Sequence, residues 1–168
     1  MYINKKMVNR AEVSIISNSL KHDGKKVVFT NGCFDILHVG HIELLGKAKS
    51  FGDVLIVGLN SDDSVKHLKG NERPINSVKD RTRVLSAVES VDFIVIFNED
   101  TPYELLREVR PDILVKGGDY SLNEIVGRNI VKSYGGKVEV IPLLKGKSTT
   151  DVINRIIQSE KAKHLDNK

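Results

Sequence analysis

Residues 27–41 have the sequence VVFTNGCFDILHVGH, and this stretch decides the fold. Its first half is apolar and rich in β-branched residues, which is typical of a short strand buried on both faces. Its second half leads into a segment whose apolar residues recur at helical spacing until about Ser50. The sequence therefore predicts a strand that ends where a helix begins.

The turn between this strand and this helix carries two histidines, His38 and His41, three residues apart. In the first turn of a helix, that spacing puts both imidazoles on one face, beside free backbone N–H groups and the positive end of the helix dipole. Such a turn is suited to bind phosphate. Gly40 has no side chain, so we expect a nucleotide to lie close to the backbone there.

Apolar runs elsewhere predict a single Rossmann-like α/β domain with a five-stranded, mostly parallel sheet. The predicted strands begin at Val27, Val54, Asp92, Asp112 and Lys137. Helices are expected within 1–26 and over 38–50, 81–91, 102–109, 122–133 and 148–157. The helix over 102–109 is predicted to begin with a capping box at 101–104. Segment 64–79 has little apolar periodicity and is predicted to be a long loop over a site at the carboxyl ends of the strands.

Length and composition also indicate one domain. The chain has 168 residues, of which 40% are apolar, and this is enough for one ordinary α/β core. We expect an N-terminal helical lead over 1–26, the main domain over 27–158 and a charged C-terminal tail over 159–168.

The charged residues favour a small phosphorylated ligand. The net charge is +4, and the 26 basic and 22 acidic residues are interspersed rather than gathered in a stripe, so we expect no nucleic-acid partner. No run has the length of a signal peptide or a membrane span, so we expect a cytoplasmic protein with no membrane partner.

Cys33 is the only cysteine, which excludes an intrachain disulfide or a cysteine metal cluster and favours a reducing compartment. A catalytic thiol is one interpretation of Cys33. A small buried residue in the turn is the other, and it is favoured because no positioned base is evident.

The motif H-x-G-H, behind a strand and a G-C-F-D turn, resembles the signature of the nucleotidyltransferase superfamily shared with the class I aminoacyl-tRNA synthetases. The resemblance implies that His38 and His41 are catalytic and stabilise the phosphorus during nucleotidyl transfer. It also implies that Lys69, counted here as catalytic, and Arg81 contact the phosphates of the nucleotide. From the residues alone, each cation could serve either a phosphate or the surface.

Residues 146–150 read GKSTT and invite comparison with a phosphate-binding loop. The Walker pattern fails because it needs a glycine where Ile141 stands. Alone, the hydroxyl run predicts a helix cap. The superfamily has a serine-threonine-threonine segment here that binds the triphosphate, so the resemblance implies this role for Ser148, Thr149 and Thr150.

Further candidate residues come from the strand ends. Asp35 is a candidate either for ordering the turn or for holding a metal-bound water, with a purely structural cap as the alternative. The resemblance places an acidic residue, Asp119, near the ribose or base. The candidate nucleotide-binding residues are Thr30, Asn31, Gly32, Cys33, Phe34, Asp35, Gly40, Arg81, Lys116, Gly118, Asp119, Ser148, Thr149 and Thr150.

A narrower resemblance rests on six segments. They read TNGCFDILHVGH, LKGNERPIN, DRTRVLSAVESVD, EDTP, RPDILVKGGDY and KSTT, and together they resemble the adenylyltransferases of ADP-heptose synthesis. The resemblance covers about 27–157. It implies transfer of AMP from ATP to a D-glycero-D-manno-heptose 1-phosphate, with Mg²⁺ carried by ATP and no dedicated metal ligands in the protein.

Two departures and two alternatives accompany this resemblance. A sugar-kinase domain precedes this one in many relatives, whereas only 26 residues do so here, so we expect a separate heptose kinase. Some cytidylyltransferases have an arginine where Leu143 and Leu144 stand, which weakens that assignment. The alternatives are another acceptor (glycerol 3-phosphate, ethanolamine phosphate, pantetheine phosphate or a flavin) and a non-catalytic nucleotide-binding module. We also expect a homodimer.

Overall fold

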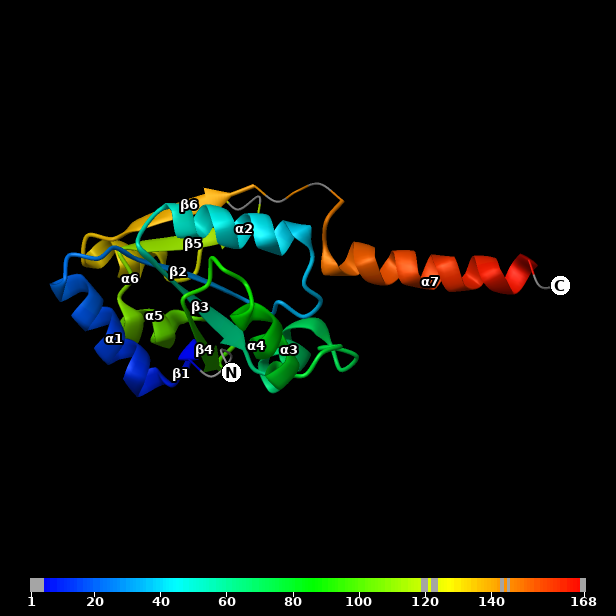
Figure 1. Cartoon of the computed structure of the whole chain (residues 1–168), viewed down its shortest axis with the longest axis horizontal. Helices are drawn as coiled ribbons and strands as arrows, with labels where there is room; N and C mark the ends of the chain where they lie inside the picture. The colour runs from blue at the N-terminus through cyan, green and yellow to red at the C-terminus, as the bar shows by residue number, and fades with distance from the viewer. Residues whose placement is uncertain (1–4, 119–120, 122–123, 143, 145, 167–168) are drawn as a thin grey trace.

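One parallel sheet forms the centre of the molecule. The computed structural model describes residues 5–118, 121, 124–142, 144 and 146–166. The strands in this part of the chain are β1 (Met7–Val8), β2 (Val27–Gly32), β3 (Val54–Asn60), β4 (Phe93–Phe97), β5 (Ile113–Gly117) and β6 (Lys137–Ile141). They lie in the order β1-β4-β3-β2-β5-β6, and every neighbouring pair is parallel. Their carboxyl ends therefore share one edge of the sheet (Figure 1).

Helices cover both faces of this sheet. The described helices are α1 (Arg10–His22), α2 (Val39–Ser50), α3 (Asp62–Lys69), α4 (Val78–Ser86), α5 (Tyr103–Val109), α6 (Arg128–Ser133) and α7 (Thr149–Asp166). Buried apolar side chains of α2 and α4 share one core with the sheet, and those of α1, α5 and α6 share the other. α7 extends away from the carboxyl edge (Figure 1).

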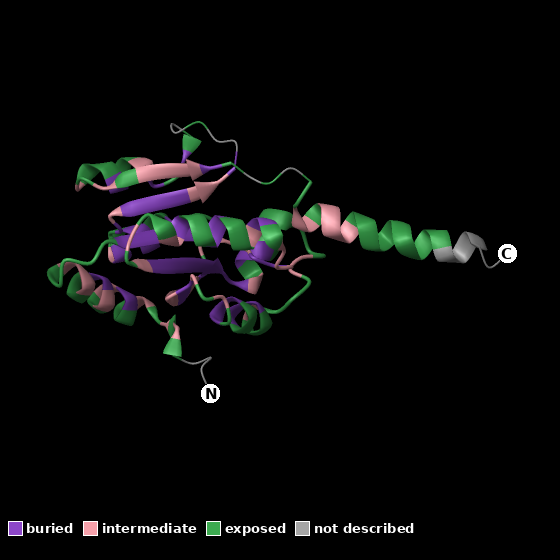
Figure 2. Cartoon of the chain, turned by 45° about the horizontal axis from the view of Figure 1, so that its top comes forward, coloured by how far each residue is buried: buried purple, intermediate pink, exposed green. Residues whose placement is uncertain are grey.

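Strand β2 shows why the sheet is buried on both sides. Val27 and Phe29 belong to the core under α1 and α5, and Val28 belongs to the core under α2, because successive side chains of a strand point to opposite faces. All three are completely buried. Figure 2 shows the buried strands between the helical layers. The predicted α/β class with a parallel sheet is confirmed.

The sheet has six strands where the sequence predicted five. The additional strand is β1, which pairs with β4 through Met7 and Val8. A two-residue strand is too short for any alternation of apolar and polar residues, so it could not be detected from periodicity.

The segment predicted as a long loop over 64–79 is largely helical. Ser61 caps α3, since its side chain accepts a hydrogen bond from the backbone N–H of Ser64. Val65 is the completely buried apolar residue of this helix, and Ser64 beside it is also buried. A helix with one apolar anchor has no detectable period. The next helix, α4, is capped by Ser77 and ends at Ser86, so it begins and ends earlier than the predicted 81–91.

Three further helices differ from their predicted bounds. The capping box predicted at 101–104 is wrong, because Pro102 is the N-cap residue of α5 and no side chain makes a capping hydrogen bond. The helix predicted over 122–133 is described only as α6, Arg128–Ser133, and residues 122–123 lie outside the described part. α7 continues to Asp166, well into the segment predicted as a charged tail. In the described part of the chain, no helix is both long enough and apolar enough to span a membrane.

Candidate active site

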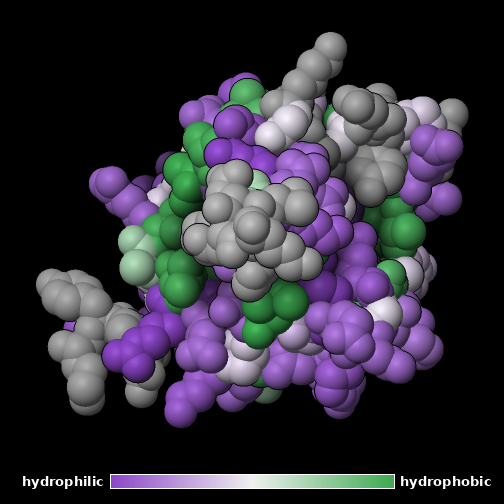
Figure 3. Space-filling model, turned by 90° about the vertical axis from the view of Figure 1, so that its right-hand side faces the viewer, coloured by the Kyte–Doolittle hydropathy of each residue, from purple (hydrophilic) through white to green (hydrophobic). Residues whose placement is uncertain are grey.

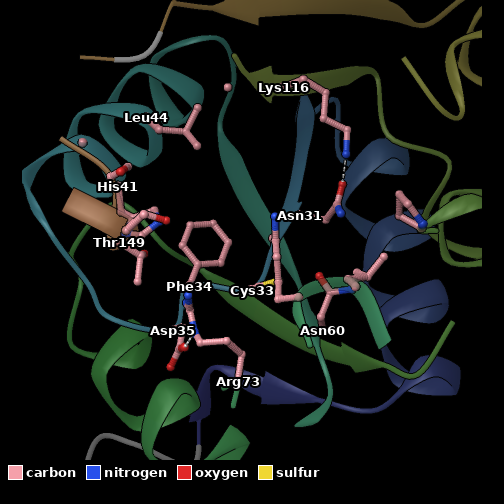
Figure 4. A pocket seen from close by; sticks show the side chains of 18 of the residues that line it. Asn31, Cys33, Phe34, Asp35, His41, Leu44, Asn60, Arg73, Lys116 and Thr149 are labelled. Atoms are coloured by element: carbon pink, nitrogen blue, oxygen red, sulfur yellow. Dashed lines mark hydrogen bonds and ion pairs between the residues drawn. The ribbon is translucent and has the colours of Figure 1, made fainter. Parts of the chain in front are cut away.

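A cavity of about 540 Å³ opens at the carboxyl edge of the sheet. Its walls come from the ends of β2, β3 and β5, from the start of α2, from the end of α3 and from the start of α7. Figure 4 shows the side chains that line it. The surface at this end of the molecule is mainly hydrophilic, with separate apolar patches (Figure 3). The position agrees with the general rule that ligands of parallel α/β sheets bind outside the carboxyl ends of the strands.

The turn after β2 has a strained backbone. Phe34 has a φ of 44°, in the left-handed region that a bulky residue rarely adopts. Its ring is buried, lies 5.1 Å from the ring of His41 between centroids, and leaves no room for a side chain on Gly32, where a Cβ would come within 3.1 Å of it. Burial of the ring therefore supports a turn that aims α2 and its histidines at the cavity.

The two histidines lie together at the start of α2. His38 is the N-cap residue, and its Nδ1 accepts a hydrogen bond of 3.1 Å from the backbone N–H of Gly40. The Nδ1 of His41 accepts a longer one of 3.4 Å from the backbone N–H of His38. The rings stack with their centroids 3.9 Å apart and an angle of 27° between their planes. The spacing thus brings both imidazoles onto one face of the helix start, as expected.

These hydrogen bonds define the chemistry of the pair. Since each Nδ1 accepts, the proton of the neutral ring is on Nε2, which can donate to a ligand. Burial, and then the neighbouring His38, lowers the pKa of His41 to about 4. Burial also lowers the pKa of His38, against an opposing effect of Asp151. The pair therefore enters the cavity as two neutral hydrogen-bond donors near neutral pH.

The start of α7 forms the wall beside the histidines. Ser148 caps this helix, because its Oγ accepts from the backbone N–H of Asp151 and donates to the carboxylate of that residue at 2.6 Å. Thr149 and Thr150 also line the cavity. Two helix N-termini, those of α2 and α7, thus border one cavity, and both favour an anion.

Gly40 allows these two helix starts to approach. A Cβ at this position would lie 3.0 Å from the backbone carbonyl oxygen of Lys147 and 3.0 Å from the His38 ring. The sequence predicted that the space at Gly40 would admit a nucleotide. In the structure Gly40 lines the cavity, and the absence of a Cβ also permits the close packing of the loop before α7 against α2.

Asp35 organises the neighbouring loop. Its carboxylate is nearly fully buried, receives backbone hydrogen bonds of 2.9 Å from Ile75 and Asn76, and pairs with the Arg73 guanidinium at 2.6 Å (Figure 4). Burial alone would raise the pKa of Asp35, but these hydrogen bonds and the charge of Arg73 outweigh it and lower the pKa. Both carboxylate oxygens are therefore committed to ordering the loop, which favours that interpretation over a metal-bound water.

Arg81 does not line the cavity, contrary to the role expected from the resemblance. Its side chain is completely buried, and it donates to the backbone carbonyl oxygens of Cys33, Asn60 and Asn76 at 2.7–3.0 Å and to the Asp62 carboxylate at 2.7 Å. The guanidinium therefore joins the ends of β2 and β3 to α4. Four of its five N–H donors are thus directed at protein oxygens, which assigns the guanidinium a role in holding the fold together.

Cys33 borders the cavity with a half-buried thiol. Burial raises its pKa, although Lys69, Arg81 and Arg73 act in the opposite direction. The thiol therefore remains protonated near neutral pH, which argues against a nucleophilic thiolate.

Lys116, at the end of β5, lies beside the end of β2. Its ammonium donates to the side-chain oxygen of Asn31 (Figure 4). Burial lowers the pKa of Lys116 to about 8. β2 and β5 are adjacent strands, and the helices that follow them cover opposite faces, so this pair marks the crevice where the sheet topology reverses.

The cavity brings together most of the predicted site residues. Those that line it are Asn31, Gly32, Cys33, Phe34, Asp35, His38, Gly40, His41, Lys69, Lys116, Ser148, Thr149 and Thr150. Thr30, Arg81 and Gly118 do not line it, because Thr30 and Arg81 point into the protein interior and the Gly118 amide bonds to the Ile141 carbonyl. Asp119 lies outside the described residues.

Several lining residues were missed in the sequence. They include Asn60, Arg73, Asp100, Thr101 and Lys147. Asn60 could have been found, since it ends a predicted strand on the edge where ligands bind. Among the described residues, no group of three or more histidine, cysteine or acidic side chains could hold a metal ion.

The sequence matches known proteins over this whole region. The model of the cytidylyltransferase-like family matches residues 29–159. The chain is 52% identical over 139 residues to the bifunctional protein HldE of Geobacter sulfurreducens, covering 83% of this chain and 28% of that protein. It is 57% identical over 145 residues to the bifunctional protein HldE of Nitratiruptor sp., covering 86% of this chain and 30% of that protein. The chain thus spans less than a third of the length of these relatives.

Solved structures share the fold. The lipopolysaccharide core biosynthesis protein from Thermoplasma volcanium is 30% identical, with a TM-score of 0.58, over 73% of this chain and 98% of that one. The pantoate-β-alanine ligase from Francisella tularensis has a TM-score of 0.62 at 22% identity, over 87% and 74% of the two chains, which is a likeness of fold alone.

Proposed function

The chain belongs to the cytidylyltransferase-like family, and from this premise we propose that it transfers AMP from ATP to a D-glycero-D-manno-heptose 1-phosphate. The products are ADP-heptose and pyrophosphate. The observation that carries the chemistry is the pair of neutral imidazoles, His38 and His41, at a helix N-terminus that opens into the cavity. Their Nε2 atoms bond to none of the described residues.

The reaction needs alignment more than acid–base catalysis. A phosphate oxygen of the acceptor forms a bond to the α-phosphorus of ATP, and the bond from that phosphorus to the bridging oxygen of the β-phosphate breaks. Pyrophosphate leaves with the electron pair. The acceptor oxygen is already ionised at neutral pH, so no base must remove a proton, and catalysis consists of positioning the two phosphates and stabilising charge.

The histidines suit this task because they donate without carrying charge of their own. Their low pKa values keep Nε2–H as a fixed donor in a partly dry site, where a hydrogen bond to a developing oxyanion is strong. His38 and His41 would stabilise the oxygens around the α-phosphorus as the centre becomes crowded in the transition state.

The β- and γ-phosphates would bind at the start of α7. The hydroxyls of Thr149 and Thr150 and the free amides of that helix supply donors, and Lys69 at the end of α3 supplies a charge. Mg²⁺ would enter as part of the MgATP substrate and be held by phosphate oxygens and water.

The choice of acceptor rests on similarity. Two relatives that are 52% and 57% identical to the chain carry the name HldE, and the Thermoplasma volcanium neighbour is named for lipopolysaccharide core biosynthesis. The block Val115-Lys116-Gly117-Gly118-Asp119-Tyr120 resembles the adenylyltransferases of ADP-heptose synthesis. These likenesses favour a heptose 1-phosphate over the phosphates of glycerol, ethanolamine or pantetheine.

A panel assay tests the proposal. The chain is incubated with ATP or CTP and with each acceptor in turn, and release of pyrophosphate is measured, with His41→Ala as the inactive control. We expect release with ATP and heptose 1-phosphate at least about tenfold faster than with any other pair. Faster release with CTP or with glycerol 3-phosphate would assign another nucleotidyltransferase, and tight ATP binding without release from any acceptor would indicate a binding module.

A further inference from the structure

Lys116 is a half-buried cation with an incomplete set of partners among the residues that the structure describes. Among the described residues its ammonium donates to a neutral amide oxygen, that of Asn31. An ammonium has three protons to donate, and removing it from water without a counter-ion is costly. The half-buried Arg73 and the buried Arg81, near the same cavity, each have a carboxylate partner. The environment of Lys116 is therefore that of a group that receives its anion from a ligand.

The position of Lys116 indicates which anion this is. In the view of Figure 4, His41 and Thr149 lie on one side of the Phe34 ring, and Asn31 and Lys116 lie on the other. The first side carries the two helix N-termini and the hydroxyls that suit a triphosphate. The second side carries the Lys116 ammonium, at the crevice between β2 and β5.

The stereochemistry of phosphoryl-type transfer connects these two sides. The attacking oxygen and the leaving oxygen lie roughly in line through the phosphorus, so the acceptor must approach from the side opposite the departing pyrophosphate. If the pyrophosphate leaves along the histidine and α7 wall, the incoming phosphate arrives on the Lys116 side. We propose that Lys116, oriented by Asn31, binds the phosphate of the acceptor rather than a phosphate of ATP. This inference rests on the proposed function.

The state of the free ammonium fits an acceptor site. Burial lowers the pKa of Lys116 to about 8, so without a ligand its ammonium begins to lose its proton just above neutral pH. A bound phosphate dianion would favour the protonated form. Asn31 offers only its amide oxygen to the ammonium and keeps its amide N–H₂ as a further donor. Together they form a small site for a phosphate group, with room in the cavity beyond it for whatever that phosphate carries.

The test separates the two substrates. Lys116→Met removes the charge and keeps the volume, and Lys137→Met is the matched control, an exposed lysine at the start of β6. The dissociation constant for ATP is measured by calorimetry without acceptor, and KM for the acceptor is measured from pyrophosphate release at saturating ATP. We expect Lys116→Met to raise KM for the acceptor roughly 10- to 100-fold and to change the ATP dissociation constant less than about twofold. Lys137→Met should change neither.

Three outcomes would overturn the inference. An ATP dissociation constant that rises as much as the acceptor KM would assign Lys116 to the nucleotide. Unchanged values of both would remove it from either site. If Lys116→Met fails to fold, Lys116→Arg is measured in the same way. This variant retains the charge, so we expect it to raise the acceptor KM less than tenfold and to bind ATP normally. A larger effect on the ATP dissociation constant than on the acceptor KM would again contradict the inference.

This test is independent of the identity of the acceptor. Should the wild-type chain use glycerol 3-phosphate instead of a heptose 1-phosphate, the proposed function fails, while the Lys116 measurement proceeds with the acceptor found, because each one attacks through a phosphate. A wild-type chain that uses no acceptor contradicts both.

Discussion

Two cations at the carboxyl edge of the sheet, the buried Arg81 and the half-buried Lys116, differ in what surrounds them. Arg81 donates to three backbone carbonyl oxygens and to the Asp62 carboxylate, and its side chain is completely buried. Lys116 donates, among the described residues, to one neutral oxygen and faces the cavity. The protein itself supplies the partners of Arg81, whereas two of the three ammonium protons of Lys116 have no acceptor in the described part of the chain.

This difference teaches how to separate structural from functional charges in the site. Asp35, Arg73 and Arg81 form what we call the anchor network: their polar atoms bond to the loop over 73–76 and to the strand ends. His38, His41 and Lys116 keep donors directed at the cavity. Residue type does not separate Arg81 from Lys116, since either cation could bind a phosphate, whereas their hydrogen bonds in the structure differ.

The largest expected effect is on the anchor network. Arg81→Met leaves the Asp62 carboxylate and three carbonyl oxygens without their donor, so we expect the free energy of unfolding to fall by about 3–5 kcal/mol. Lys116→Met removes a charge that pairs with no carboxylate among the described residues, and it should change the free energy of unfolding by less than about 1 kcal/mol. Urea unfolding of both variants measures this, and equal losses of stability would break the comparison.

The second effect is on turnover. His41→Ala removes a free Nε2–H donor, and if that donor acts mainly in the transition state, turnover should fall on the order of 10²-fold while ATP affinity changes little. Turnover, the ATP dissociation constant and the melting temperature are measured on one preparation. His22→Ala, at the exposed end of α1, is the matched control. Near-normal turnover in His41→Ala, or equal losses of binding and turnover, would contradict the catalytic role.

A third, smaller effect concerns the loop that Asp35 organises. Asp35→Asn replaces a carboxylate that pairs with Arg73 and accepts two backbone amides, and we expect a loss of roughly 2 kcal/mol in the free energy of unfolding. Limited proteolysis should cut the variant faster within 70–77, while ATP binding stays within about threefold of the wild type. Unchanged proteolysis with a large loss of ATP binding would instead assign Asp35 to the ligand.

The sequence predicted the functional side of this comparison better than the structural side. The strand, the turn and the helix start over 27–41 are contiguous, so their pattern reports the histidine pair directly. The role of Arg81 depends on carbonyl oxygens of Cys33 and Asn60, which are distant in the chain and meet only in the fold. No propensity or spacing in a single sequence carries that information.

The same reasoning explains the differences in secondary structure. The cap at Ser61 was present in the sequence, but α3 has a single completely buried apolar residue, Val65, and therefore no apolar stripe. β1 exists only because β4 offers an edge to pair with. Lys116 was predicted as a site residue from its place at a strand end. Its hydrogen bond to Asn31 and its position in the cavity became known only from the structure.

The smallest expected effect is a dependence of stability on pH that comes from His41. Its pKa in the folded protein is about 4, below the value near 6.5 of an unfolded chain, so the unfolded state binds a proton more readily. His41 therefore does not change the free energy of unfolding above pH 6.5, and it lowers that free energy as the pH falls from 6.5 towards 4.

Other groups titrate in the same range, so the measurement compares how much unfolding free energy each protein loses. Between pH 7 and pH 5 the wild type should lose on the order of 1 kcal/mol more unfolding free energy than His41→Asn, which has no imidazole to protonate. His22→Asn, altered at an exposed position, should follow the wild type. If His41→Asn and the wild type lose stability in parallel, the imidazole of His41 is not held neutral by burial, and the donor role assigned to its Nε2 loses its physical basis.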